Sequence, residues 1–126
     1  MVSRASSLPD EVRPGQSIQL LQELHILTRE GKLNQDSRRK LKQVYHLYQF
    51  IEKMLLDLPP AMNGLLTLAD HGAGKSYLGF ILYDLYFKNL PNSHLYGIET
   101  RPELVRKSQA LADQLGFGRM SFLNIS

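Results

Sequence analysis

Residues 64–80 constrain the fold of this chain more than any other stretch. They are typical of a strand, a glycine-rich turn and the start of a helix. A short apolar run predicts a strand that is buried on both faces: Leu65, Leu66, Leu68 and Ala69. Gly72 and Gly74 leave room for a sharp turn and for the close approach of a ligand. The stretch therefore predicts an α/β fold with a site for an anionic or polar ligand at the turn.

Three kinds of protein use such a turn, and the local pattern does not distinguish between them. Residues 69–76 fit a relaxed phosphate-binding P-loop, in which Lys75 would reach the β- and γ-phosphates and Ser76 would bind Mg²⁺. A dinucleotide-binding fingerprint fits poorly, because Tyr77 stands where its third glycine is required. The third is the nucleotide loop of a methyltransferase, with Asp70 at the end of the strand. A turn without any ligand, in which Ser76 only caps the next helix, is the structural alternative.

A second strand is predicted at residues 94–99, which end in the acid Glu99. In α/β nucleotide sites, the acid that binds the ribose stands at about this place after a glycine-rich turn. Its carboxylate can accept hydrogen bonds from the 2′- and 3′-hydroxyls of a ribose. A P-loop protein has no role for Glu99, and the chain has no hydrophobic run that ends in a Walker-type aspartate. Glu99 therefore favours a ligand that contains a ribose.

A further helix and a third strand follow Glu99. Thr100 and Glu103 have the spacing of a capping box, with Pro102 in the first turn of the helix. The helix is expected to end at Gly116 and to carry one buried stripe: Leu104, Ser108, Leu111 and Leu115. Residues 119–125 predict the third strand.

The helix predicted directly after the glycine-rich turn, at residues 76–88, is apolar nearly all round. Such a helix needs partners on several sides, for example the sheet and the helices that precede it in the chain. Asp84 interrupts this apolar surface and is expected to be a surface or capping carboxylate rather than a catalytic residue.

These pieces together resemble the first half of a class I S-adenosylmethionine-dependent methyltransferase, over residues 65–123. The matching segments are Asp-His-Gly-Ala-Gly at 70–74, Gly-Ile-Glu at 97–99, Arg-Pro-Glu-Leu-Val at 101–105 and Ala-Leu-Ala-Asp-Gln-Leu-Gly at 110–116. The loop is similar to that of a subgroup that reads roughly Asp-x-Gly-Cys-Gly-Lys-Gly-Tyr-Leu, from which this chain departs at Ala73 and Ser76. Ser76 in place of glycine would narrow the approach to the methionine part of the cofactor.

The resemblance implies a Rossmann-like parallel sheet with S-adenosylmethionine as the cofactor and no bound metal. Glu99 would bind the ribose hydroxyls, and Asp70 would order the loop and contact the cofactor, either directly or through water. Thr100 would border the adenine. The remaining residues implied to line the methionine and ribose are those of the turn: Gly72, Ala73 and Gly74.

Only the first three strands of the family's larger sheet are recognisable in this sequence. The resemblance therefore implies the cofactor-binding N-terminal portion of an enzyme, truncated at Ser126, with its catalytic residues and the segments that recognise the methyl acceptor beyond this point. A chain of this kind would leave sheet edges uncovered, so we expect either a missing C-terminal half or self-association. A non-catalytic fragment or interaction module is the alternative.

An α-helical segment is predicted at residues 17–60, between a flexible arm at 1–16 and the partial Rossmann-like domain at 61–126. A first helix is expected from the N-cap Ser17 to near Gly31, with one apolar face: Leu20, Leu21, Leu24 and Leu27. A longer second helix, beginning at Asp36 or Ser37, is predicted from a seam of alternating three- and four-residue spacings: Leu41, Val44, Tyr48, Ile51, Leu55 and Leu58.

The other side of this second helix is basic and carries aromatic residues. Arg38, Arg39 and Lys42 stand beside Tyr45 and His46. Two interpretations are open: a solvated helix face, or a surface on which cations meet RNA phosphates and aromatic rings stack on bases. The second interpretation makes RNA the first expectation for the methyl acceptor, ahead of a small molecule or a protein.

The composition excludes several other classes of protein. The 126 residues contain no cysteine, so disulfides, thiolate zinc sites and cysteine nucleophiles are excluded. No apolar run is long enough to span a membrane, and no secretory signal is visible, so we expect a cytoplasmic protein. The net charge of +3 permits contact with nucleic acid without requiring it.

Overall fold

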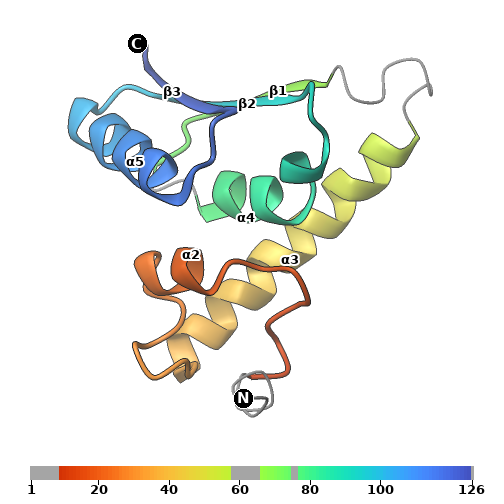
Figure 1. Ribbon diagram of the computed structural model, residues 1–126, viewed down its shortest axis with the longest axis vertical. Helices are drawn as coiled ribbons and strands as arrows, with labels where there is room; N and C mark the ends of the chain where they lie inside the picture. Colours follow the sequence, from red (N-terminus) through yellow and green to blue (C-terminus); the bar gives the residue numbers. More distant parts are fainter. Residues whose placement is uncertain (1–8, 58–65, 75–76, 126) are drawn as a thin grey trace.

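A three-stranded parallel sheet forms one layer of the computed structural model, which describes residues 9–57, 66–74 and 77–125 (Figure 1). Its strands are β1 (Thr67–His71), β2 (His94–Glu99) and β3 (Met120–Asn124), in the order β1-β2-β3. The predicted α/β class and the order of the elements are confirmed. All three strands run in the same direction, so their carboxyl ends meet at one edge, with Glu99 opposite Asn124.

Two helices cover one face of this sheet, α4 (Tyr77–Leu85) and α5 (Pro102–Leu115), and the N-terminal helices pack beneath them (Figure 1). The side chains of Leu95, Phe122 and Met120 point to the covered face and are buried there. On β1 the residues that face the other way are exposed: Thr67, Ala69 and His71. The prediction of a first strand buried on both faces is therefore wrong within the described residues, because the helices lie on one face only.

Gly97 on β2 allows a close contact between this strand and its neighbour. A Cβ atom at residue 97 would lie 2.6 Å from the ring of Phe122 on the neighbouring strand. Phe122 in turn packs against Phe80 of α4, with 5.6 Å between the ring centroids. A side chain at residue 97 would push this ring out of a filled core, so the position requires glycine.

The N-terminal helix α2 (Ile18–Glu23) is much shorter than predicted. Its N-cap is Ser17 as expected, and the Ser17 hydroxyl accepts a hydrogen bond from the Leu20 amide at 3.1 Å. The helix stops early because His25 adopts a left-handed conformation with a φ of 61°. The predicted leucine face is nevertheless buried, because the residues after the helix fold back onto the same core: Leu20, Leu21, Leu24 and Leu27.

The long helix α3 (Gln35–Leu56) follows the prediction closely. Its N-cap is Asn34, whose side chain accepts a hydrogen bond from the Ser37 amide at 2.8 Å. The predicted seam faces the core and is buried or half-buried as far as it is described: Leu41, Val44, Tyr48, Ile51 and Leu55. Leu58 lies outside the described residues.

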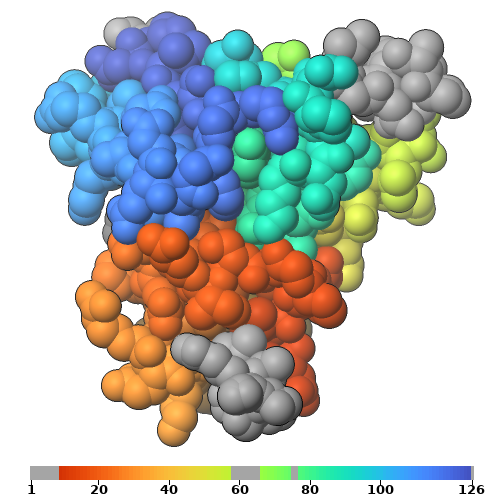
Figure 2. Space-filling view, viewed as in Figure 1, coloured from red at the N-terminus to blue at the C-terminus, as the bar shows by residue number. Residues whose placement is uncertain are grey.

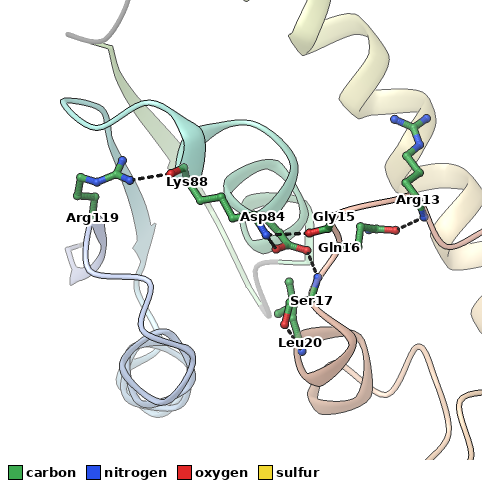
Figure 3. A network of polar contacts seen from close by, with 8 residues as sticks. All are labelled: Arg13, Gly15, Gln16, Ser17, Leu20, Asp84, Lys88 and Arg119. Carbon is green, nitrogen blue, oxygen red and sulfur yellow. Dashed lines mark hydrogen bonds and ion pairs between the residues drawn. The ribbon is translucent and has the colours of Figure 1, made fainter. Parts of the chain in front are cut away.

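A buried carboxylate joins α4 to the N-terminal segment (Figure 3). Asp84 is completely buried and accepts a hydrogen bond from the Ser17 amide at 2.7 Å. It also pairs with the Lys88 ammonium at 2.7 Å, on the short 3-10 helix η2 (Phe87–Asn89). The same ammonium donates to the Gly15 carbonyl at 2.8 Å. The expectation of a surface carboxylate is wrong, because the N-terminal segment covers Asp84.

Residues 9–16 belong to the packed structure, whereas residues 1–8 lie outside the described part of the chain. The Tyr45 hydroxyl on α3 lies 2.8 Å from the Glu11 carbonyl oxygen and 2.6 Å from Gln16 Oε1, so its single proton is shared between these two acceptors. The guanidinium of Arg13 lies over the Tyr45 ring, 4.3 Å from its centroid. The predicted flexible arm is therefore corrected for residues 9–16, which α3 and η2 hold in place.

The N-terminal helices and the strand-bearing part form one continuous body in space-filling view (Figure 2). The segment from Gly15 to Leu27 lies directly against α4 and α5, and buried leucines fill the contact. None of the helices in the described ranges combines the length and the apolar character that a membrane crossing needs.

Candidate functional site

The turn between β1 and α4 folds back onto the end of β2. Gly72 and Gly74 both have positive φ values, 69° and 58°, which explains why the sequence has glycine at these two positions. The amides of Gly72 and Ala73 donate to the carbonyl of Ile98 at 2.8 and 3.0 Å. Two amides of the turn therefore make hydrogen bonds within the protein, although the sequence predicted a ligand at this turn. Lys75 and Ser76 lie outside the described residues.

Glu99 ends β2 beside this turn, as the sequence predicted. Its Oε1 atom accepts a hydrogen bond from the Gly74 amide at 2.8 Å, and its Oε2 atom accepts one from the Arg101 amide at 3.1 Å. These two main-chain donors come from different connections, one after β1 and one after β2. They hold the carboxylate in a fixed orientation at the carboxyl edge of the sheet.

The side chain of Arg101 covers this carboxylate. Its Nε atom lies 2.6 Å from Glu99 Oε2, and its Nη2 atom lies 3.3 Å from Glu99 Oε1. The Arg101 side chain is 59% exposed, whereas that of Glu99 is only 6% exposed. Glu99 is therefore buried although it ends a strand, since Arg101 shields it from solvent. These hydrogen bonds lower the pKa of Glu99 to about 2, so the carboxylate is ionised at neutral pH.

Asp70 lies inside β1, and its side chain points to α4. Its Oδ2 atom is directed at α4, 3.8 Å from the place where a Cβ atom on Gly79 would stand. Burial raises the pKa of Asp70. Its side chain makes no hydrogen bond with any other described residue, so the described contacts give no support to its predicted role in ordering the loop.

Asn124 at the end of β3 is a site residue that the sequence reasoning missed. Its side-chain amide donates to the carbonyl of Glu99 at 3.0 Å and to that of Thr100 at 2.9 Å. It thereby fixes the turn after β2, on which both Glu99 and Arg101 depend. A polar residue at the carboxyl end of a parallel strand was the available signal.

The structure therefore brings five of the six predicted site residues to one edge of the sheet: Gly72, Ala73, Gly74, Glu99 and Thr100. Asp70 is the exception, because its side chain lies beneath the sheet. Open parallel sheets bind their ligands at the carboxyl ends of the strands, where these residues gather. No group of three or more potential metal ligands is found within the described ranges. A fixed carboxylate beside a glycine turn suits a ligand that donates hydrogen bonds, such as a sugar diol.

Comparisons with known proteins bear on this site. A family model described as a methyltransferase domain matches residues 39–126. A similar solved structure is a SAM dependent methyltransferase from Aquifex aeolicus, with 20% identity over 63% of this chain and 47% of that chain and a TM-score of 0.38. Another is a putative protein-L-isoaspartate O-methyltransferase from Plasmodium falciparum in complex with S-adenosyl-L-homocysteine, with 15% identity, 86% and 61% coverage and a TM-score of 0.44.

The chain therefore spans 47% and 61% of the length of these two structures. A comparison of the sequence with curated proteins finds no match.

Proposed function

Since the chain belongs to the methyltransferase-domain family, we propose that it binds S-adenosylmethionine and forms the cofactor-binding portion of a methyltransferase. The observation that carries the proposal is the Glu99 carboxylate, fixed by the amides of Gly74 and Arg101 at the carboxyl edge of the sheet. An ionised carboxylate in this place can accept hydrogen bonds from the two hydroxyls of a ribose. The nearby glycines carry no side chains that would block a nucleoside.

The sulfonium of the bound cofactor supplies a methyl group that is already a good electrophile. The residues of this chain bind and orient the donor rather than activate it. Glu99 holds the ribose, and the turn of Gly72, Ala73 and Gly74 borders the ribose and methionine. Thr100, exposed directly after Glu99, borders the adenine.

The P-loop alternative has less support from the hydrogen bonds of the turn. A phosphate-binding loop directs its successive amides at the phosphates. Here the amides of Gly72 and Ala73 donate to Ile98, and that of Gly74 donates to Glu99. A phosphate in the same place would also meet the negative charge of Glu99.

Isothermal titration of the 126-residue chain tests the proposed ligand. We expect S-adenosylhomocysteine to bind and Mg-ATP not to bind, because the site offers an acceptor for hydroxyls and, among the described residues of the turn, no free run of amides for phosphates. Lys75→Ala is the matched variant, since it removes the cation that a P-loop requires. Mg-ATP binding that disappears in Lys75→Ala would replace the methyltransferase proposal with the P-loop one.

We further propose that the exposed side of α3 contacts an RNA acceptor. Support comes from His46 and Phe50, whose rings pack edge to face at 5.2 Å on the surface, beside the exposed Arg39 and Lys42. Exposed aromatic rings next to cations are the usual elements of a single-strand binding surface. Arg38 adds less positive charge to this proposed RNA surface than predicted, because its Nε atom pairs with Glu11 at 2.7 Å. Arg39 also has an acidic neighbour, Asp36 at 3.4 Å, but both side chains of that pair are largely exposed.

A double variant, Arg39→Glu with Lys42→Glu, should weaken the binding of a single-stranded RNA oligonucleotide. The slope of log K against log salt should also become shallower, by about 0.7 for each lost phosphate contact. The control is Arg106→Glu with Lys107→Glu on α5, which makes the same change of charge at two exposed positions away from α3. Fluorescence anisotropy at several salt concentrations measures both values. An equal loss in the two double variants would leave α3 as a solvated face.

A further inference from the structure

We propose that Arg101 competes with the ribose for Glu99, so that binding of the cofactor requires the Arg101 side chain to leave the carboxylate. This inference rests on the proposed function and assigns to Arg101 the control of affinity at the same site. Three observations carry it: the number of donors on Glu99, the difference between main-chain and side-chain donors, and the position of the guanidinium over the glycine turn.

The carboxylate of Glu99 has no capacity left for a ligand while Arg101 is in place. Two ionised carboxylate oxygens offer about four lone-pair sites. Oε1 receives the Gly74 amide and Arg101 Nη2, and Oε2 receives the Arg101 amide and Arg101 Nε. All of these sites are therefore occupied by donors of the protein itself. A ribose can bind only if some of these donors leave.

The two side-chain donors are the ones that can leave. The amides of Gly74 and Arg101 belong to turns that the sheet and α5 hold in position. The guanidinium belongs to a side chain that is 59% exposed, so water can solvate it after it moves. Its departure frees one lone-pair site on each oxygen of Glu99. Two free sites on adjacent oxygens match the two hydroxyls of a vicinal diol.

The guanidinium also occupies the approach to the turn. Arg101 Nη2 lies 3.7 Å from the place where a Cβ atom on Gly74 would stand. The guanidinium thus lies at van der Waals distance from the open side of Gly74. Arg101 is the N-cap residue of α5, but its side chain makes no capping hydrogen bond there. Removal of the side chain therefore takes no capping hydrogen bond away from the start of α5.

Arg101→Ala should bind S-adenosylhomocysteine about two- to fivefold more tightly than the parent chain, because opening an ion pair at an exposed arginine costs little. Arg101→Lys should lie between the two, since an ammonium cannot form the paired contacts of a guanidinium. Arg106→Ala is the control, an exposed arginine on the same helix, and should leave the affinity unchanged. Isothermal titration measures all four chains.

A second comparison separates competition from a general effect on the site. In chains that carry Glu99→Gln, the further change Arg101→Ala should tighten binding by a smaller factor than in the parent chain. The reason is that Arg101 then has no charged carboxylate at residue 99 with which to pair. Unchanged or weaker binding in Arg101→Ala alone would overturn the inference, and weaker binding would make Arg101 a direct contact of the ligand. Parent chain that fails to bind S-adenosylhomocysteine would count against the proposed function itself.

Discussion

Glu99→Gln is expected to weaken the binding of S-adenosylhomocysteine by about ten- to a hundredfold, as measured by isothermal titration. The change keeps the size of the side chain but removes its charge and replaces one acceptor oxygen with a donor. The amide of glutamine can then accept from only one ribose hydroxyl. The amides of Gly74 and Arg101 donate to the two separate oxygens of Glu99 in the parent chain. The single side-chain oxygen of glutamine would have to accept from both.

The burial of Glu99 makes a stability control necessary. Because the carboxylate ties the turn to β2, Glu99→Gln should lower the melting temperature as well as the affinity. Arg101→Ala should lower the melting temperature too, yet it should tighten binding. The two variants therefore share the sign of the effect on stability and differ in the sign of the effect on affinity. An affinity of Glu99→Gln within about twofold of the parent would remove Glu99 from the ribose site.

Asp84→Ala is expected to lower the free energy of unfolding by about 2–4 kcal/mol. The carboxylate is completely buried, so its loss leaves the Ser17 amide without its partner in the interior. The Lys88 ammonium loses its partner as well, but its side chain is 33% exposed and can turn toward water. This exposure keeps the expected loss below that of a fully enclosed ion pair.

Urea denaturation followed by circular dichroism measures this loss. Asp113→Ala is the matched control, because Asp113 is exposed on α5 and its side chain accepts a hydrogen bond only from Gln109, at 3.1 Å, among the described residues. The control should change the free energy of unfolding by less than about 0.5 kcal/mol. An Asp84→Ala variant as stable as the control would mean that the contact of α4 with the N-terminal segment contributes nothing to folding.

The sequence predicted the elements that depend on local pattern. The seam predicted on α3 and the stripe predicted on α5 are buried or half-buried as far as they are described, so the structure confirms both. Gly116 closes α5 in the left-handed conformation, with a φ of 74°, as its position predicted. Such signals lie within a few residues of one another, so they can be recognised without knowledge of the tertiary structure.

Several contacts that hold the fold and the site join residues far apart in the chain, and the sequence could not predict them. The partner of Asp84 is 67 positions away at Ser17, and the partner of Glu99 at Gly74 is 25 positions away. Arg101 was expected only to follow a capping box at Thr100, but it is itself the N-cap residue of α5. The guanidinium of this N-cap residue pairs with Glu99. A pattern of residue types carries no information on such a choice between neighbouring caps.

The hydrogen bonds between Asp84 and the N-terminal segment also bear on where this protein can be divided for experiments. The methyltransferase-domain match begins at residue 39, within α3. A fragment cut at that boundary would lose Ser17 and Gly15, the main-chain partners of Asp84 and Lys88. It would also expose the apolar surface that Leu20 and Leu21 cover. The family match is therefore shorter than the packed unit seen in the structure, and expression boundaries should include the N-terminal segment.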